Sequence, residues 1–360
     1  MVYNLPQCYM KKTLLLAFAL ILSVATFAQQ QLATLNHENT ITVFYGQNAL
    51  SQAHNAAVNG DIITLSPGIF NAVDITKAVT IRGAGMFPDT AAKTEATILV
   101  NNYYIQISEY QDYSLYMEGI YNNSGIVTIR ESHNAQFVKC YFMTIDHDKY
   151  WVNNNWAYGP EMNSSYIQCI IRNFMHDPYN TRTCAYDTRF VNSAILGLTS
   201  AGNPQIKNCV AQLSNTTSSL QNVTVENSIL YCANNTTSSN GDIATNYITS
   251  FYCIGINTYG SGRVYYQSTP ANNHLMNSFA YSDVFETFNG SSSATSFKLK
   301  ESVATTFLDE DGDQIGMYGG QQPFDPKVRN PLIGKVTVAP QSTSDGKLQV
   351  DIELKNNSQQ

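Results

Sequence analysis

A short phrase of apolar and polar residues recurs seven times along the middle of this chain. Each copy contains a Cys or Ser, which an apolar residue follows directly, and in six copies another apolar residue lies three positions earlier. The Cys or Ser positions are Cys140, Cys169, Ser193, Cys209, Ser228, Cys253 and Ser278. They are 29, 24, 16, 19, 25 and 25 residues apart. A repeat with this period predicts the stacked coils of a solenoid.

Stacking explains why such short strands are stable. A single strand cannot bury its apolar face or pair its free edges, whereas successive coils do both. The residue directly before the Cys or Ser is Asn in four copies, at positions 192, 208, 227 and 277. Asn tolerates a left-handed backbone, and its amide can hydrogen-bond to equivalents in the coils above and below. We therefore predict a two-residue corner with a stacked Asn, flanked by apolar positions that line the core.

Residues 48–59 form the one segment with the pattern of a short amphipathic helix. Asn48 is a favourable N-cap, and Gly60 is a natural stop. The expected apolar face consists of Leu50, Ala53, Ala57 and Val58. Two strand-and-turn units follow, at residues 61–70 and 74–85.

This opening stretch resembles a known family. Asp61-Ile-Ile-Thr-Leu-Ser-Pro-Gly68, placed directly after a helix, is similar to the first coil of right-handed parallel β-helix proteins of the pectate-lyase-like superfamily, of the exported bacterial type. The resemblance covers roughly residues 40–320. It implies an all-β fold, a right-handed parallel β-helix, with an N-terminal capping helix. The family's lyases use Asp or Glu as calcium ligands with an Arg or Lys base, and its hydrolases use clustered Asp. Only Asp146, Asp148 and Arg172 approach either set here.

The chain divides into four parts on this interpretation. Residues 1–28 read as a signal peptide, with Lys11-Lys12, an apolar run at 14–24 and a small residue at the cleavage point, and with Met10 as the expected start. Residues 29–60 hold an N-terminal strand and the capping helix, and residues 61–330 the β-helix. Residues 331–360 alternate with period two around Asp345-Gly346 and predict a C-terminal β-hairpin, as an end cap or a tail.

Composition and targeting narrow the function. The apolar run is too short to span a membrane, so we expect a secreted, periplasmic or cell-surface protein with no transmembrane segment after signal removal. Charged residues make up 13% of the chain, and the net charge is −7 without a basic patch. This excludes nucleic acid as a natural partner and favours a polysaccharide or cell-surface glycan.

The longest interval, between Cys140 and Cys169, predicts a loop at residues 146–161 that leaves the solenoid. It carries both tryptophans of the chain. The candidate sugar-binding residues are Tyr150, Trp151, Trp156 and Tyr158, because aromatic rings stack on the apolar faces of sugars. The alternative is that these rings pack the loop onto the neighbouring coil.

The phrase His-Asp-x-Tyr occurs twice, at residues 147–150 and 176–179. Each His follows its Cys by seven residues, so in-register coils would stack His147 near His176 and Asp148 near Asp177. Paired carboxylates beside His can hold a metal or supply an acid and a base. The catalytic candidates are Asp146, His147, Asp148, Arg172, His176 and Asp177. The alternative is a polar turn whose side chains cap the backbone.

Two further features could bind a ligand or form a covalent bond. Asp309, Asp311 and Asp313 alternate as calcium ligands do, although a tight acidic turn explains the same pattern. Calcium is thus the one candidate cofactor. Cys140 and Cys169 fall on successive coils, where stacked strands bring Cα atoms within disulfide range. Free thiols are the alternative.

No complete catalytic set is visible, so the sequence favours binding over catalysis. The first hypothesis is an exported protein that binds polysaccharide, or mediates surface interaction, through the solenoid face and the 146–161 loop. The second is a polysaccharide lyase or glycoside hydrolase. The scaffold alone does not decide between them.

Overall fold

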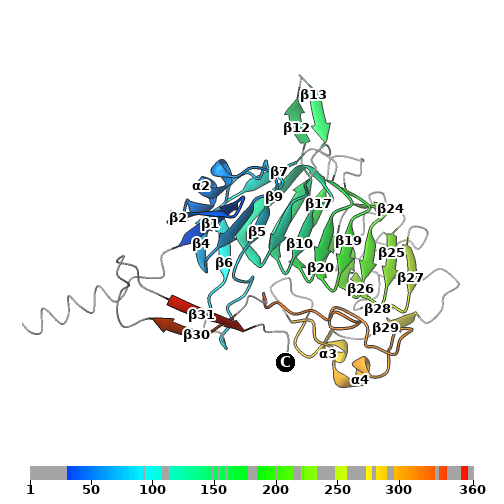
Figure 1. The fold of residues 1–360 in the computed structure, drawn as a ribbon. Coiled ribbons are helices and arrows are strands. Elements are labelled where there is room, and N and C mark those ends of the chain that lie inside the picture. The colour runs from blue at the N-terminus through cyan, green and yellow to red at the C-terminus, as the bar shows by residue number, and fades with distance from the viewer. Residues whose placement is uncertain are drawn as a thin grey trace, which may run out of the picture.

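The computed structural model shows one long solenoid of β-strands (Figure 1). It describes residues 31–91, 94–107, 113–147, 149–152, 155–158, 161–176, 185–198, 201–213, 220–221, 223–232, 248–257, 273–277, 281–289, 296–328, 332–338 and 350–355.

One sheet, here sheet A, has eleven strands in the order β2-β1-β3-β5-β8-β10-β15-β19-β22-β25-β27. The pairs β2–β1 and β1–β3 are antiparallel, and every later pair of neighbouring strands in this sheet is parallel. The strands are β1 (Leu32–His37), β2 (Thr40–Tyr45), β3 (Ile62–Leu65), β5 (Thr80–Arg82), β8 (Tyr116–Glu118), β10 (Gln136–Val138), β15 (Ser165–Ile167), β19 (Arg189–Val191), β22 (Gln205–Lys207), β25 (Val223–Glu226) and β27 (Ile248–Phe251).

A second sheet, sheet B, has sixteen strands and turns around the other sides of the coils. Its strands are β4 (Gly68–Asn71), β6 (Thr97–Val100), β7 (Tyr103–Gln106), β9 (Ile120–His133), β11 (Tyr141–His147), β14 (Glu161–Met162), β16 (Ile170–Ile171), β17 (Phe174–His176), β18 (Ala185–Tyr186), β20 (Ala194–Leu198), β21 (Ala201–Gly202), β23 (Val210–Leu213), β24 (Leu220–Gln221), β26 (Ile229–Cys232), β28 (Ile254–Asn257) and β29 (His274–Asn277). Successive coils pair in register, as Phe137, Tyr166 and Phe190 do. The predicted right-handed parallel β-helix is confirmed.

The predicted corners are present and have a simple backbone cause. The residue before the Cys or Ser has a positive φ in six of the seven copies: 51° at Lys139, 54° at Gln168, 46° at Asn192, 50° at both Asn208 and Asn227, and 49° at Tyr252. The predicted corner is not found at Asn277, which lies in strand β29. Asn is enriched there because it adopts this left-handed conformation at low cost. A second left-handed ladder, at Asn134, Asn163, Asp187 and Asn203, lies five residues earlier in each coil. The two ladders bracket the short strands of sheet A.

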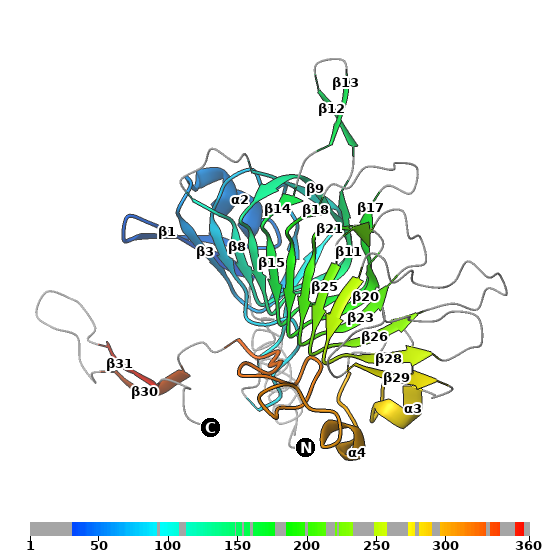
Figure 2. The same ribbon diagram turned by 90° about the vertical axis from the view of Figure 1, so that its right-hand side faces the viewer.

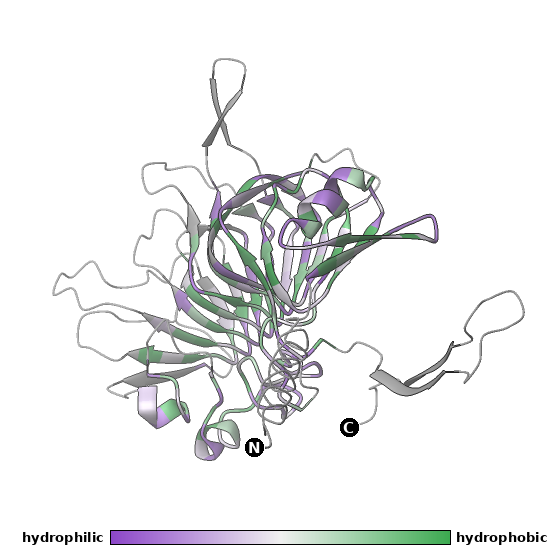
Figure 3. Ribbon diagram, turned by 90° about the vertical axis from the view of Figure 1, so that its left-hand side faces the viewer, coloured by the Kyte–Doolittle hydropathy of each residue, from purple (hydrophilic) through white to green (hydrophobic). Residues whose placement is uncertain are grey.

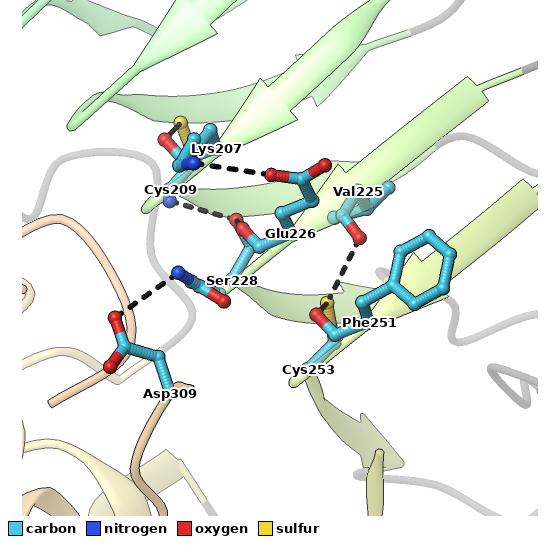
Figure 4. Close-up of polar contacts among 9 residues, drawn as sticks. Lys207, Cys209, Val225, Glu226, Ser228, Phe251, Cys253 and Asp309 are labelled. Atoms are coloured by element: carbon cyan, nitrogen blue, oxygen red, sulfur yellow. Dashed lines mark hydrogen bonds and ion pairs between the residues drawn. The ribbon is translucent and has the colours of Figure 1, made fainter. Parts of the chain in front are cut away.

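The Cys and Ser side chains point into the solenoid. Cys140, Cys169, Ser193, Cys209 and Ser228 are all fully buried. The Ser193 hydroxyl accepts the backbone N–H of Cys169 in the coil before it (3.0 Å), and the Ser228 hydroxyl accepts that of Cys209 (2.9 Å; Figure 4). Small polar groups therefore satisfy the backbone at the corner while keeping the core narrow.

The sequence predicted that the apolar residue after the Cys or Ser lines the solenoid core. This prediction is wrong. Tyr141, Ile170, Ala194, Val210 and Ile229 belong to a second apolar cluster on the outside. Residues from the C-terminal part of the chain cover them: Val284, Phe285, Phe288, Phe297, Leu299, Val303, Ile315, Met317 and Phe324. Strand alternation explains the error, because the Cys itself takes the inward position.

This covering segment includes the short helices α3 (Tyr281–Val284) and α4 (Glu301–Ala304) and a strap, residues 309–328. The strap runs back along the corners toward the N-terminal end. Asn227 donates to Asp309 (3.2 Å), Asn192 to the Gly319 carbonyl (2.8 Å), and Gln168 to the Pro323 carbonyl (2.9 Å). The sequence predicted that the corner amides bond to one another from coil to coil. At these three corners the amides bond to the strap instead. A Cβ on Gly320 would lie 2.3 Å from Asn208 Nδ2, which shows how closely the strap approaches.

Helix α2 (Ala49–Ala56) lies over the N-terminal end of the solenoid (Figure 3). Asn48 is its N-cap, as predicted, but without a side-chain capping bond, and the Asn48 amide oxygen instead accepts from Asn71 (2.8 Å). Leu50, Ala53 and Ala57 are buried, whereas Val58 is 50% exposed and is not part of the face.

At the other end of the chain, β30 (Leu332–Val338) and β31 (Val350–Lys355) pair antiparallel, as the alternation predicted. Figures 1 and 2 show this hairpin apart from the stacked coils of the solenoid.

Candidate functional site

The long coil forms a two-stranded ribbon that stands off the solenoid (Figures 1 and 2). Strands β12 (Lys149–Val152) and β13 (Asn155–Tyr158) pair antiparallel. Trp151 is directly opposite Trp156, and Lys149 is opposite Tyr158. Residues opposite each other, and residues two apart, share a face of a β-ribbon. The register therefore places Trp151, Trp156 and Tyr158 on one face and Tyr150 on the other.

The ribbon leaves the solenoid through a neck between His147 and Glu161. Both side chains are buried inside the coil, at 1% and 0% exposure. His147 Nε2 lies 2.5 Å from Glu161 Oε2, and the Tyr166 hydroxyl donates to Glu161 Oε1 (2.7 Å). His147 comes from β11, Glu161 from β14 and Tyr166 from β15. The three sides of one coil are thus joined across the lumen at the neck.

Tyr166 is held in place by the rings around it. It stacks between Phe137 and Phe190, with centroid separations of 4.8 and 5.3 Å, and it meets Phe142 and Phe174 edge-on. Burial raises the pKa of the Tyr166 hydroxyl well above 10, and the adjacent Glu161 carboxylate raises it further. The hydroxyl therefore stays protonated and remains a donor to Glu161.

The catalytic candidates do not form one cluster among the residues whose side chains are described. His147 points inward, whereas its strand neighbour Asp146 takes the alternate, outer side and is half-buried. Arg172 is half-buried and donates to Met143 Sδ (3.5 Å). Strand alternation thus separates Asp146 from His147.

The predicted stacking of the two His-Asp-x-Tyr phrases is present in the backbone at their first residues. His147 is the register partner of His176 in β17. Asp148, Asp177 and the side chain of His176 lie outside the described residues, as do the side chains of Tyr150, Trp151, Trp156 and Tyr158. The roles of these residues remain predictions.

An outer row of side chains runs along the coils beside the neck. Tyr104, Thr128 and Asp146 occupy matching register positions on three neighbouring strands, and all three are half-buried. The Arg130 guanidinium lies 3.8 Å from the centre of the Tyr104 ring. This row, with Arg130, is called the shelf below. It offers an aromatic ring and polar groups at the base of the ribbon.

The acidic turn at Asp309 has the hydrogen bonds of a tight turn, which was the alternative to a calcium site. The Asp309 carboxylate accepts the backbone N–H of Asp311 (3.0 Å) and of Asp313 (2.8 Å) through one oxygen, and the Asn227 amide through the other. Asp311 and Asp313 are exposed. In the part of the chain that the structure describes, no three His, Cys, Asp or Glu residues are grouped to hold a metal ion. Asp309 organises a turn and anchors the strap.

The described cysteines Cys140, Cys169, Cys209 and Cys253 are free and buried, so the structure contains no Cys140–Cys169 disulfide. Burial raises the pKa of the Cys209 and Cys253 thiols to about 12. They are therefore unreactive core residues.

Sequence reasoning missed Glu161 and Tyr166. One signal was available: Tyr166 is the only Tyr among the seven residues that lie three positions before the repeated Cys or Ser. Glu161 sits where the predicted loop ends, but nothing local shows that it turns inward.

No protein-family model matches the chain, and no curated protein matches it. A search of solved structures found similarity to the crystal structure of pectate lyase Pel9A, at 12% identity over 82% of this chain and 87% of that chain, with a TM-score of 0.32. Such a low score carries no argument, so the β-helix assignment rests on the strand pairing described above. No helix in the described ranges is long and apolar enough to cross a membrane.

Proposed function

We propose that this protein is an exported β-helix scaffold that binds polysaccharide or a cell-surface glycan through the β12–β13 ribbon and the shelf beside it. The observation that carries the proposal is the cross-strand register of Trp151 and Trp156 on a ribbon that projects from the solenoid. Two aromatic residues at opposite register positions share one face of the ribbon. Aromatic platforms bind sugars through their apolar faces.

The shelf supports the same proposal. Tyr104 and Asp146 lie on the outer surface of the coils from which the ribbon emerges, so a glycan lying on the ribbon would reach them. Hydroxyl, carboxylate and guanidinium groups beside an aromatic surface are the groups that select among sugar hydroxyls.

A polysaccharide lyase or glycoside hydrolase is the second candidate. The in-register backbones of His147 and His176 favour it. Against it stands the inward burial of His147, whose Nε2 is engaged by Glu161. A catalytic group must reach the proton it transfers, and a fully buried side chain does not.

Export is supported by the charged, apolar and small-residue segments within residues 1–28, which precede the described residues.

A pull-down on insoluble polysaccharides, followed by calorimetric titration with soluble fragments of any polysaccharide retained, tests the binding proposal. We expect Trp151→Ala and Trp156→Ala each to weaken binding at least about fivefold, because a stacked aromatic contributes about 1 kcal/mol or more. Tyr45→Ala is the matched control, since Tyr45 is 57% exposed on β2, a different part of the molecule. Unchanged affinity in both tryptophan variants would contradict the proposal.

The enzyme alternative has its own test. A depolymerisation assay over the same polysaccharides, with and without calcium, should show no turnover by the wild-type protein. Turnover that is lost in His176→Ala would replace the binding proposal with the lyase or hydrolase.

A further inference from the structure

We infer that His147, Glu161 and Tyr166 form a clamp that closes the neck of the long coil and sets the position of the β12–β13 ribbon. These three are positioning residues for the ligand site, and that consequence rests on the proposed function. The clamp itself does not, because it follows from geometry alone.

The clamp lies where the chain leaves and re-enters the solenoid. His147 is the last residue of β11, and Glu161 is the first residue of β14. Their side chains meet inside the coil at 2.5 Å. Just outside, Lys149 and Tyr158 form the first register pair of the ribbon. The neck is therefore closed twice, by a side-chain contact within the core and by backbone pairing above it.

The neighbouring coils show that these polar groups are not a general feature of the core. Glu161 takes a ladder position that is Ser132 in the coil before and Ala185 in the coil after. Tyr166 takes a position that is Phe on both sides, at Phe137 and Phe190. A ring suffices for the aromatic stack in those coils. The carboxylate and the hydroxyl that binds it occur together, in the coil that carries the ribbon.

The physical need for such a clamp follows from the ribbon. An isolated two-stranded hairpin is marginally stable in water. Its position relative to the shelf therefore depends on its two attachment points. A closed neck removes the freedom of these ends before a ligand arrives, which lowers the entropy cost of binding.

Hydrogen exchange of residues 149–158, measured by mass spectrometry on the full chain, tests the clamp without any ligand. Glu161→Ala should raise exchange in the ribbon at least tenfold. Leu230→Ala is the matched control, because Leu230 is a fully buried core residue of β26, and strands β16, β20 and β23 lie between β26 and β11. Compared at equal loss of global stability, Leu230→Ala should leave exchange in the ribbon unchanged. Equal exchange in the two variants would overturn the clamp, because Glu161 would then act as ordinary core.

Two milder variants keep the test valid if Glu161→Ala does not fold. Tyr166→Phe removes one hydroxyl from a ring whose stacked neighbours are both Phe, so folding is retained, and ribbon exchange should rise severalfold. Glu161→Gln keeps both contacts within reach and should restore most of the protection. No change of ribbon exchange in Tyr166→Phe, or exchange in Glu161→Gln as fast as in Tyr166→Phe, would count against the clamp.

The polysaccharide pull-down separates this inference from the proposed function. If wild-type protein retains no polysaccharide but Glu161→Ala releases the ribbon, the clamp stands and the binding proposal fails. If polysaccharide binds but the ribbon exchanges equally in Glu161→Ala and Leu230→Ala, binding stands and the clamp fails.

Discussion

The coil at the neck and the coils on either side of it have the same backbone, but their core side chains differ in polarity. The coils on either side of the neck have Phe137 and Phe190 in the aromatic ladder and Ser132 and Ala185 in the ladder beside β14. The coil between them has Tyr166 and Glu161 in those places, with His147 opposite. The polar residues appear where the chain departs from the solenoid to form the ribbon.

This difference teaches how a repeat protein accommodates an insertion. An apolar core sets no particular position for a long excursion, because hydrophobic contacts are not directional. A hydrogen-bonded triad fixes distances and angles across the lumen. Its members satisfy one another, so the buried charge is tolerated.

The largest effect expected is that of Glu161→Ala on global stability. The substitution removes the buried carboxylate that both His147 and the Tyr166 hydroxyl contact, which should lower the free energy of unfolding by about 3–5 kcal/mol. Chemical denaturation measures it. Ala185→Ser, at the next position of the same ladder, should cost less than about 1.5 kcal/mol. Similar losses in the two variants would erase the distinction between the coils.

The corners differ from the clamp in the direction of their polar groups. The clamp residues face into the core, whereas the corner amides face outward and bond to the strap. Asn192→Ala should lower the free energy of unfolding by about 3 kcal/mol, since it removes hydrogen bonds to the Met317 and Gly319 carbonyls and strains a left-handed residue. Asn192→Gly keeps the backbone conformation and should lose only about half as much. If Gly and Ala are equally destabilising, backbone strain plays no part at this corner.

The hydroxyl of Tyr166 can be isolated from its ring. Tyr166→Phe should lower the free energy of unfolding by about 2 kcal/mol, the value of a hydrogen bond to a charged group, and should leave the aromatic stack intact. The near-ultraviolet circular dichroism should be preserved. A neutral or stabilising Tyr166→Phe would show that Glu161 does not need this donor.

The smallest effect concerns a histidine outside the clamp. Burial and, as a smaller cause, the positive charge of Lys77 together lower the pKa of His54 from 6.5 to about 4. A depressed histidine pKa stabilises the fold above about pH 6.5, and this stability is lost as the pH falls toward 4. The loss should be roughly 1–2 kcal/mol after allowance for solvent screening. Thermal unfolding between pH 7 and 4 should show this slope, and His54→Gln should reduce it. An unchanged slope would assign the acid sensitivity elsewhere.

Much of the scaffold could be predicted from the sequence because it repeats. The corners followed from Asn at a fixed offset, and the ribbon followed from one interval that is too long. The direction of Tyr141 and its equivalents was wrong, because burial under the strap produces the same apolar pattern as burial in the solenoid. The strap itself has no repeat that would reveal where it lies.

The clamp could not be predicted for a different reason. His147 and Glu161 are 14 residues apart, and their contact depends on the ribbon leaving and returning at one place. His147 was identified, but as a surface candidate beside Asp146 and His176. Only the strand parity of β11, which local sequence does not fix, shows that it points inward.

The chain provides its own probe of the central claim, since its only two tryptophans, Trp151 and Trp156, are both in the ribbon. Tryptophan fluorescence of the wild-type protein, titrated with a soluble fragment of a retained polysaccharide, therefore reports on the ribbon alone. A saturable change in emission, with the same midpoint as the calorimetric titration, is the result expected if the ribbon binds the glycan. Calorimetric binding without any change in tryptophan emission would place the glycan elsewhere on the solenoid and contradict the account.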